Sequence, residues 1–410
     1  MNRHVRVLVI GGGPAGLTAA TALAESVEVL VLEREHAAGG VPRHCDHTGF
    51  GLRDMLRSLS GPTYARRLVD RAHAAGVEIW TNATVTGWVG DRAVAVTTPH
   101  GVYAITADAV VLATGARERP RSARRIPGDR PAGVFTTGQL QQAVHLHHHQ
   151  VGSRAVVVGS ELVSWSAVLT LRESGCKTVL MTTEYPKPDV YRALSVVGRI
   201  VFRPKLRTNT RVVRVVGRSR VTAVEVEDVR TGQRSSVACD TVVFTGDWIP
   251  DHELARLRGL EIDEATLGPR VDAGLRTSEP GIFAAGNVLH PVDTGDAAAL
   301  DGRHVASTVM AYLNGASPDR DGVTLHPGST LRWVAPSMYR PDDSSAPRGR
   351  LLAWSSVFRM FPVVELHQGG RLVARRRSIW PAAPGRVFRI PWKMLREVRP
   401  ADGSIEVAIR

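Results

Sequence analysis

Apolar runs alternate with glycine turns and helical patterns along the first part of the chain. Residues 5–10 and 27–32 are runs that are apolar except for one charged residue each, which is typical of parallel strands that helices cover on both faces. The segment 14–26 between them has the pattern of a helix that begins directly after a glycine turn. The order strand, turn, helix, strand predicts the opening βαβ unit of a doubly wound sheet.

The same order returns near Arg154, where AVVVG is a strand that runs into a turn. A helix over 161–174 and a strand over 177–181 follow. The repetition predicts an α/β chain with two Rossmann-like dinucleotide-binding domains, each built of three layers (β-β-α). The patterns also predict helices over 61–75 and 296–313, and strands over 109–113, 211–216, 221–227, 241–245 and 281–285.

The last fifth of the chain has a different pattern. Residues 314–330 are polar and rich in turn-forming residues, and we interpret them as a linker. Short β-like runs follow, including a hairpin over 363–375 that turns at Gly369-Gly370. We expect the tryptophans among these runs to form a core rather than a binding platform: Trp333, Trp354, Trp380 and Trp392.

These patterns divide the chain into three predicted domains. The first dinucleotide-binding domain is discontinuous and takes residues 1–120 and 240–315. The second takes residues 121–239, and residues 331–410 form a small β-rich C-terminal domain.

The composition is that of a folded protein, which we expect in the cytoplasm. Hydrophobic residues make up 43% of the 410 residues, enough for large buried cores. The apolar start runs straight into the glycine turn without a cleavage region, so we expect no export signal. We also predict no transmembrane segment, because no charge-free apolar stretch reaches about 18 residues. The three cysteines form no C-x-x-C pair, which argues against a disulfide framework.

Most of the positive charge lies near the C-terminus. The formal net charge is +13, and residues 331–410 carry 15 Lys/Arg against 6 Asp/Glu. An arginine-rich composition explains this excess, and a surface that docks an acidic electron-transfer partner or second subunit explains it as well. No nucleic-acid recognition motif accompanies the charge, so we predict no nucleic-acid partner.

The first glycine turn predicts a phosphate site. Gly11, Gly13 and Gly16 form G-x-G-x-x-G between the first strand and the first helix. The first glycine permits the tight turn, the second lets the backbone approach a pyrophosphate, and the third lets the helix pack on the sheet. The helix N-terminus adds free N–H groups. Glu33 ends the second strand, 22 residues after Gly11, where a carboxylate accepts hydrogen bonds from a ribose diol.

Two later segments connect the chain with a known superfamily. They are T-x-D-A-V-V-L-A-T-G at 106–115 and G-I-F-A-A-G-N at 281–287. With them the chain resembles the pyridine-nucleotide–disulfide oxidoreductase superfamily of flavoproteins. The resemblance implies that the dinucleotide is FAD, that the backbone at Val85 contacts adenine, and that Asn287 stands where the family's acid binds the ribityl chain. The predicted cofactor-binding residues are Gly11, Gly13, Pro14, Ala15, Gly16, Glu33, Arg34, Gly40, Val85, Ala113, Thr114, Gly115, Gly286 and Asn287.

A closer resemblance extends over residues 39–52, 115–120 and 126–141. These segments look like a branch of uncharacterised FAD-dependent dehydrogenases, related to flavoprotein subunits found beside glycerol-3-phosphate dehydrogenases and opine oxidases. The branch implies a dehydrogenase and fixes no substrate. The helix after Asn287 would stabilise the negative charge of reduced flavin with its dipole, so we predict a catalytic flavin.

The second glycine turn is degenerate. It reads G-S-E-L-V-S, with Glu161 at the second glycine position and Ser164 at the third. A carboxylate at this position repels a pyrophosphate and blocks its close approach. The sequence therefore does not decide whether the second turn binds NAD(P)H, as the family implies. Glu184 is the candidate acid for the ribose of that nucleotide.

Cys45 and His47 are the candidate catalytic residues. They lie where family members keep redox-active cysteines near the flavin. A single cysteine excludes dithiol chemistry, but it could cycle through a sulfenate or act as a thiolate activated by a histidine. His47 could be the general base that removes a proton while hydride moves to flavin N5. A packed cysteine and a structural histidine are the alternatives.

Other polar side chains are given structural interpretations. The histidines at 145 and 147–149 are bunched without a distant partner, so we predict a solvated helix end and no metal site. Arg43, Arg117 and Arg119 could bind an anionic substrate or lie on the surface.

Three functions follow. The leading one is an FAD-dependent dehydrogenase that oxidises a small hydroxy or amino compound and passes electrons to a partner or quinone. The second is an NAD(P)H-dependent reductase of a peroxide, quinone or disulfide that uses Cys45. The third is a non-catalytic or electron-relay flavoprotein subunit.

Overall fold

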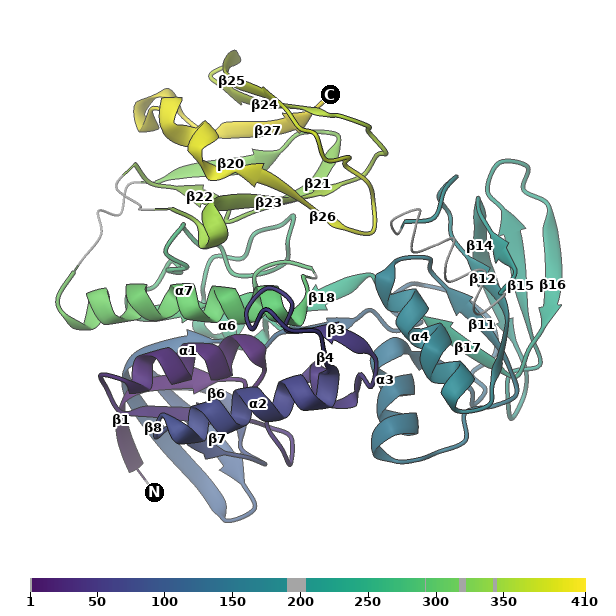
Figure 1. Cartoon of the computed structure of the whole chain (residues 1–410), viewed down its shortest axis with the longest axis horizontal. Helices are drawn as coiled ribbons and strands as arrows, with labels where there is room; N and C mark the ends of the chain where they lie inside the picture. Colours follow the sequence, from purple (N-terminus) through teal and green to yellow (C-terminus); the bar gives the residue numbers. More distant parts are fainter. Residues whose placement is uncertain (1, 190–203, 292, 317–321, 342–344) are drawn as a thin grey trace. The chain divides into compact units, whose positions relative to one another are not determined.

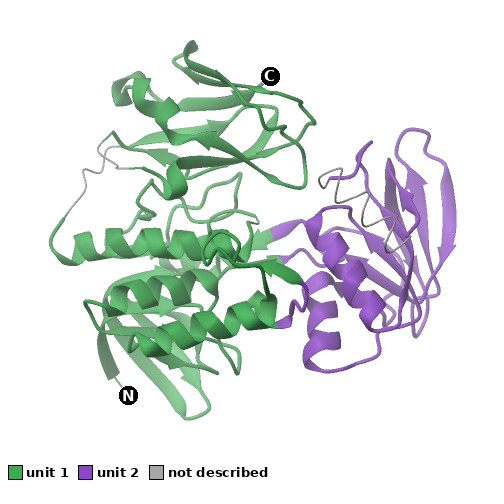
Figure 2. Ribbon diagram, in the orientation of Figure 1, with its two compact units in different colours: residues 1–43, 48–117, 249–410 green, residues 44–47, 118–248 purple. Residues whose placement is uncertain are grey.

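The computed structural model describes residues 2–189, 204–291, 293–316, 322–341 and 345–410. The chain forms two compact units (Figure 2). Unit 1 contains residues 1–43, 48–117 and 249–410, and unit 2 contains residues 44–47 and 118–248. Residues 240–248, which the sequence pattern assigned to the first dinucleotide-binding domain, therefore belong to the second.

Unit 1 contains a mixed sheet in the order β5-β2-β1-β8-β7-β6, with β19 also paired to β8. Its strands are β1 (Asn2–Ile10), β2 (Val29–Leu32), β5 (Glu78–Trp80), β6 (Thr84–Gly90), β7 (Ala93–Thr98), β8 (Gly101–Leu112) and β19 (Ile282–Ala284). The long strand β8 pairs antiparallel with β7 and parallel with β1 and β19. The apolar residues of β1 and β2 are buried, as expected for central parallel strands.

Helices cover this sheet. Figure 1 shows α1 between α7 and α2, and α1 contacts both. The close approach of α1 and α7 requires Gly302, because a Cβ there would lie 2.1 Å from the Ala15 carbonyl oxygen. The helices of this part are α1 (Pro14–Ala24), α2 (Gly61–Ala74), α6 (Glu253–Arg258), α7 (Gly295–Leu313) and the 3₁₀ turn η3 (Gly286–Val288).

Unit 2 repeats the plan with a parallel sheet in the order β10-β17-β11-β12-β13 and an antiparallel sheet β14-β15-β16. The strands are β10 (Val134–Thr136), β11 (Arg154–Val158), β12 (Lys177–Thr182), β13 (Leu206–Arg207), β14 (Thr210–Val216), β15 (Ala223–Asp228), β16 (Arg234–Ala238) and β17 (Thr241–Phe244). The helices are α3 (Thr137–Gln141), the π-helix η2 (Gln142–Leu146) and α4 (Leu162–Glu173). The predicted two-domain α/β fold is confirmed.

The C-terminal part of unit 1 has two sheets, in the orders β22-β20-β27-β24-β25 and β21-β23-β26. Its elements are β20 (Val323–Pro327), β21 (Leu331–Ala335), β22 (Met338–Tyr339), η4 (Pro347–Gly349), β23 (Arg350–Ser355), β24 (Val363–Gln368), β25 (Arg371–Arg377), β26 (Val387–Pro391), η5 (Trp392–Glu397), η6 (Pro400–Asp402) and β27 (Ile405–Ile409). The hairpin at Gly369-Gly370 joins β24 and β25 as predicted.

Two predictions for this region were partly wrong. The interpretation of 314–330 as a linker fails for β20, which pairs with β27 and β22; residues 317–321 lie outside the described part. Trp333 and Trp392 are buried in the core, whereas Trp380 is 69% exposed and belongs to no core. A loop that carries an apolar side chain has the same residue pattern as a short strand, so sequence could not distinguish them.

Short elements complete the described structure: η1 (Val41–His44), β3 (Thr48–Phe50), β4 (Leu59–Ser60), β9 (Ala116–Glu118) and β18 (Trp248–Pro250). β3 pairs with β4, and β9 pairs with β18. None of the described helices is long and apolar enough to cross a membrane.

Candidate functional site

The first glycine turn is shaped by backbone contacts that leave no room for side chains. Gly11 has φ +111° and donates its N–H to the Leu32 carbonyl at 2.9 Å. A Cβ on Gly11 would lie 2.4 Å from the Ala113 carbonyl oxygen, and one on Gly16 would lie 1.9 Å from the Gly11 carbonyl oxygen. The turn therefore needs glycine at both positions.

Three separate segments meet at the start of α1. Gly13 is the N-cap and no side chain caps it, and Pro14 is the first helical residue. A Cβ on Gly40, which has φ +63°, would lie 2.9 Å from the Cα of Gly13, and one on Gly286 would lie 2.7 Å from the Cβ of Ala15. The structure thus brings these predicted cofactor residues together around an uncapped helix N-terminus, the arrangement that binds a pyrophosphate.

Glu33 lies at the end of β2 beside the turn and is buried. Its Oε2 accepts the N–H of Gly12 at 2.9 Å, and its Oε1 accepts the N–H of Glu35 at 2.8 Å. Burial raises the pKa of Glu33, and the two backbone N–H groups oppose this effect. Arg34 points to solvent and lies 3.6 Å from the Asp251 carboxylate.

The segment 113–115 is fixed by a residue that sequence reasoning missed. Ala113 donates its N–H to the Ile10 carbonyl at 2.8 Å. The Thr114 hydroxyl donates to the Asp251 carbonyl at 2.7 Å, and the Asp251 N–H donates to the Gly115 carbonyl at 2.9 Å. Asp251 follows β18 directly and carries no motif, so only the fold reveals its role.

The Asp251 side chain also accounts for Arg117, which pairs with it and with Glu253 at 2.7 Å. Arg117 is therefore occupied by acids of its own unit rather than open to an anionic substrate.

Val85 is placed by the segment that leads into β6. The Ala83 N–H donates to the Glu33 carbonyl at 2.9 Å, which holds the start of β6 and its partly buried Val85 near β2.

Asn287 closes the loop that leads into α7. Its Nδ2 donates to the Asp293 carbonyl at 3.2 Å, and its Oδ1 accepts the Asp293 N–H at 3.1 Å. A carboxylate could accept the second bond but could not donate the first. This pair of bonds gives a physical reason for an amide at a position where the family has an acid.

The same loop is held by arginines of the C-terminal part. The Asp293 carboxylate is buried and lies 3.3 Å from both Arg348 and Arg389. Arg348 also binds the buried Asp301 at 3.0 Å. From sequence alone these arginines belong to an excess of charge, because their acidic partners lie too far away in the chain to be recognised.

Several groups in this cluster have shifted pKa values, and those of Asp301 and His290 move furthest from their ordinary values. Burial raises the pKa of Asp301 to about 7, although Arg348 opposes the shift. Burial lowers the pKa of His290 to about 4. The His290 ring stacks on Trp333, with 5.0 Å between ring centroids. The cluster therefore holds a neutral imidazole beside two acids and two arginines.

The first turn of α7 contains a buried carboxylate, Asp296. It accepts the backbone N–H of Arg53 at 3.0 Å and the Arg53 guanidinium at 3.0 Å. An acid in the first turn satisfies the helix dipole, and Arg53 balances its charge.

The second glycine turn has the same backbone and different side chains. Gly159, with φ +140°, donates its N–H to the Thr182 carbonyl at 2.8 Å, as Gly11 does to Leu32. The Glu161 carboxylate then fills the turn: Oε2 accepts the Ser160 N–H at 3.0 Å, and Oε1 accepts the Thr245 hydroxyl at 2.8 Å.

The matching backbone of the two turns also shows which residue of the second turn corresponds to Glu33, the predicted ribose acid of the first. Thr182 corresponds to Leu32, so the residue equivalent to Glu33 is Thr183, whose hydroxyl donates to Asp189 at 3.2 Å. Glu184 is one residue further along and exposed. In the first turn the Glu33 carboxylate accepts the Gly12 N–H. The corresponding N–H of the second turn belongs to Ser160, and the Glu161 carboxylate accepts it.

Cys45 and His47 lie in the short segment that belongs to unit 2. Cys45 is buried, and its Sγ lies 3.2 Å from the Oε1 of Gln141. Burial, with smaller effects of Glu118 and Asp46, raises the pKa of Cys45 to about 12. His47 is half-buried. The thiol form of Cys45 therefore predominates at neutral pH in this arrangement.

The histidine tract is partly as predicted. His147, His148 and His149 are exposed, but the His145 side chain is nearly buried and lies 3.3 Å from Asp46 and 3.6 Å from Glu173. His145 is thus a packed residue of unit 2, because it is on the inner side of η2. Within the described ranges, no group of three or more His, Cys, Asp or Glu is arranged to hold a metal ion.

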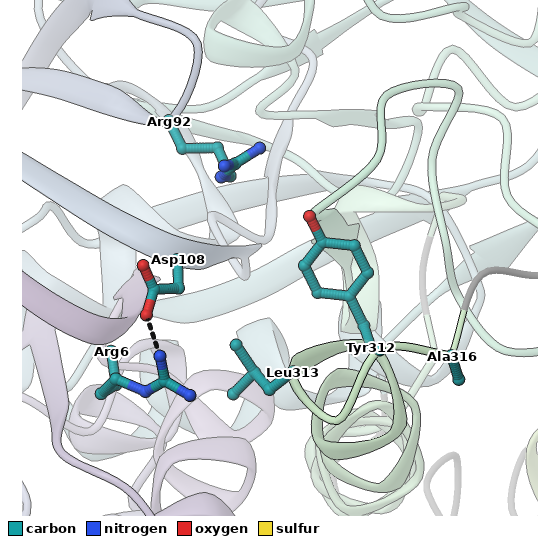
Figure 3. Close-up of a pocket in the computed structure, with 7 residues that line it drawn as sticks. Arg6, Arg92, Asp108, Tyr312, Leu313 and Ala316 are labelled. Carbon is teal, nitrogen blue, oxygen red and sulfur yellow. Dashed lines mark hydrogen bonds and ion pairs between the residues drawn. The ribbon is translucent and has the colours of Figure 1, made fainter.

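A cavity of about 350 Å³ lies at the opposite end of the first sheet from the glycine turn. Figure 3 shows Arg6 bound to Asp108 and the Arg92 guanidinium directed toward the Tyr312 hydroxyl. Arg6 belongs to β1 and Tyr312 to the last turn of α7. The cavity therefore contains none of the predicted cofactor residues.

The family match defines the class of this chain as an FAD-dependent oxidoreductase. The chain belongs to the pyridine nucleotide-disulphide oxidoreductase family, whose model matches residues 5–314. The predicted flavoprotein class and its FAD cofactor are confirmed, and the family also uses NAD(P)H.

Known proteins similar to this chain differ in activity. Thioredoxin reductase of Treponema pallidum (strain Nichols) is 29% identical over 332 residues, which cover 77% of this chain and 99% of that protein. An opine oxidase subunit of Agrobacterium tumefaciens (strain Ach5) is 26% identical over 351 residues, or 78% of this chain and 68% of that protein. The structure of T. acidophilum thioredoxin reductase matches with a TM-score of 0.63 and 23% identity, covering 77% of this chain and all of that chain, which shows the shared fold.

The two cofactors of the family fit this chain differently. The glycine turn lets the backbone come close to a ligand, no side chain caps the start of α1, and Glu33 follows β2 directly, so the first turn fits FAD. The second turn carries the Glu161 side chain at the position of Gly13, so a pyrophosphate that enters this turn must displace a carboxylate.

Proposed function

We propose that this protein is an FAD-dependent dehydrogenase that oxidises a small hydroxy or amino compound and passes the electrons to a partner protein or a quinone. The observation that carries the proposal is the Glu161 carboxylate inside the second glycine turn. A flavoenzyme that cannot take electrons from NAD(P)H needs another donor, and the substrate is that donor.

The Glu161 side chain opposes NAD(P)H by both its charge and its bulk. A pyrophosphate at the second turn would face a carboxylate of the same charge at contact distance. It would also have to displace Glu161 from the Ser160 N–H and the Thr245 hydroxyl. Leaving either group unsatisfied costs free energy, so both effects weaken nucleotide binding.

FAD, when bound, supplies the acceptor for a hydride. The chain's part is to hold the cofactor with the first glycine turn and Glu33, and to take the proton that an alcohol or amine loses. His47 remains our candidate for this base, because histidine is the usual general base in enzymes and the His47 side chain is only half-buried. A small-molecule substrate is part of the same proposal.

A second candidate is an NAD(P)H-dependent reductase, and the similarity to thioredoxin reductase of T. pallidum supports it. It would use Cys45, which has no second cysteine nearby in sequence. The raised pKa of Cys45 opposes a thiolate in the arrangement described here. A Cys45→Ser variant separates the two candidates: the reductase loses turnover with FAD still bound, and the dehydrogenase keeps it.

A third candidate is an electron-relay subunit whose partner holds the substrate site. The similarity to the opine oxidase subunit of A. tumefaciens supports it.

For each of these candidate functions we propose that the protein works in the cytoplasm. This is in keeping with Cys45, Cys176 and Cys239, which form no disulfide in the described structure.

The test is an anaerobic titration of the purified yellow protein with NADH and NADPH, followed by flavin absorbance. We expect no rapid bleaching of the wild type. Glu161→Gly should bleach measurably faster, because it removes both the charge and the bulk from the turn. Glu161→Gln is the matched control: it keeps the bulk and should gain much less. Rapid bleaching of the wild-type flavin by one equivalent of NADH would overturn the proposal.

A further inference from the structure

The C-terminal part carries a cluster of large apolar side chains in solvent. Met360 and Phe361 are 72% and 57% exposed, and Ile379 and Trp380 are 76% and 69% exposed. We call these four residues the apolar tip. Scattered apolar residues on a surface are ordinary, but four large ones side by side mark an interaction site.

Backbone bonds hold the two halves of the apolar tip together. Arg359 and Ala382 exchange N–H···O bonds of 2.8 and 2.9 Å, and the Ser378 N–H donates to the Pro362 carbonyl at 2.8 Å. Segments 359–362 and 378–382 are therefore neighbours. Ser378 also braces the second segment, since its hydroxyl donates to the Trp380 carbonyl at 3.0 Å. The apolar side chains project from a fixed support.

The surroundings of the apolar tip have one sign of charge. Residues 355–387 contain six arginines and a single acid, Glu365. Glu365 is buried and binds Arg375 and Arg410, so it contributes little negative potential at the surface. Arg359, Arg376 and Arg377 are exposed on the same two segments or directly beside them. Exposed apolar side chains with exposed arginines next to them in the chain match an anionic surface that apolar groups can enter.

We propose that the apolar tip inserts into an anionic lipid surface and holds the enzyme there. Phospholipid headgroups bind the arginines, while Trp380, Ile379, Met360 and Phe361 enter the boundary of the acyl chains. An acidic protein would also attract the arginines, but a protein interface places its anchoring side chains in matching pockets and mixes both charges at its rim. A lipid surface needs neither. The inference goes beyond the proposed function, because it concerns where the enzyme works.

The experiment is co-sedimentation of the purified FAD-containing full chain with vesicles. One set contains phosphatidylcholine alone and the other equal parts of phosphatidylcholine and phosphatidylglycerol. We expect binding to the second set only, weakened by salt. A double Ile379→Ser/Trp380→Ser variant should bind at least roughly tenfold more weakly, because two apolar side chains no longer leave water. Arg376→Glu should lose roughly fivefold or more, from one lost attraction and one added repulsion.

Controls come from the same unit. Leu257→Ser removes an apolar side chain of similar exposure on α6, and Arg66→Glu reverses an exposed charge on α2; neither should change vesicle binding appreciably. Equal binding of the tip variants and the wild type would overturn the proposal, as would no binding to either vesicle set. A concentration-dependent dimer that the tip variants abolish would assign the surface to a second copy instead. Vesicle binding that requires an added purified protein would assign it to that partner. None of these measurements depends on catalytic turnover, so a negative result for vesicle binding would not bear on the proposed dehydrogenase activity.

Discussion

Single residues in the first turn are determined by the space that the backbone leaves. Gly16 lies in the first turns of α1, where a Cβ would lie 1.9 Å from the Gly11 carbonyl oxygen, a backbone atom that cannot yield without moving the turn. The fingerprint could be recognised from sequence because this requirement is local. Its chemical consequence is equally local.

We predict that Gly16→Ala lowers the bound flavin per protein strongly and destabilises the fold by about 2 kcal/mol or more, as overpacking does. Flavin absorbance after gel filtration and denaturant unfolding measure the two effects. Gly138→Ala is the control, since a Cβ on that helical glycine would meet the Glu118 carboxylate at 3.7 Å, an ordinary van der Waals distance. Equal losses in both variants would contradict the steric explanation.

Asn287 shows where family resemblance and local chemistry diverge. Its amide donates to one backbone group of Asp293 and accepts from another, so the loop before α7 depends on both functions of the side chain. The sequence indicated the position but not this bond pair, because the partner backbone is placed by the loop.

Asn287→Asp, which installs the family's residue, should therefore destabilise the protein by about 1–3 kcal/mol, because it leaves the Asp293 carbonyl without its donor and sets a carboxylate against it. Thermal unfolding with FAD bound tests this. Asn314→Asp at the exposed end of α7 is the matched change and should cost much less. A variant as stable as the wild type would show that the Asn287 bonds contribute nothing.

Elements with local patterns were predicted well. The helices α1, α2, α4 and α7 and the hairpin β24-β25 follow the expected ranges closely, because their periodicity and turn glycines lie within or directly beside the segment. What failed was the assignment of elements to partners. The strand at 241–245 was expected, yet as β17 it pairs with β10 and β11 of unit 2.

The sequence did contain a signal for β17. The segment D-T-V-V-F-T-G at 240–246 resembles D-A-V-V-L-A-T-G at 108–115, which is the closing strand of the first domain. Two closing strands imply one for each domain, and this comparison would have placed the boundary correctly. For β20 no such signal exists, because its pairing with β27 is set by residues about eighty positions away in the chain.

One element that joins the C-terminal part to the loop before α7 is η4, through its Arg348. This side chain binds Asp293 and Asp301, both buried, at 3.3 and 3.0 Å. We predict that Arg348→Ala costs about 3 kcal/mol or more, because it leaves two buried carboxylates with less compensation, and that it speeds flavin release. Denaturant unfolding and flavin fluorescence provide the measurements.

Arg371→Ala is the control for this prediction. Arg371 is 80% exposed and 3.9 Å from Asp402, so its removal should leave stability unchanged within error. If Arg348→Ala behaved like Arg371→Ala, the C-terminal arginines would be surface charge, as composition alone suggested. The contrast tests whether the tail holds the loop or merely lies against it.

The stability of the whole molecule should depend on pH through the same cluster, with two opposing contributions. The pKa of His290 falls from 6.5 to about 4, so this group's contribution is present above pH 6.5 and is lost as the pH falls through about 4. The pKa of Asp301 rises from 3.8 to about 7, so its contribution is present below pH 3.8 and is lost as the pH rises through about 7. Between about pH 4 and 6.5 the two slopes cancel.

Removing either group should reveal the other. In Asp301→Asn, the unfolding free energy should increase with pH across that window, by about 1.4 kcal/mol per pH unit more than in the wild type. In His290→Phe, which keeps a ring to stack on Trp333, the unfolding free energy should decrease with pH by the same amount relative to the wild type. Denaturant titrations at several pH values measure both slopes. Slopes of the same sign in the two variants would contradict the opposed burial of an acid and a neutral imidazole. The double variant should return the difference to near zero, because both proton-binding groups are then absent.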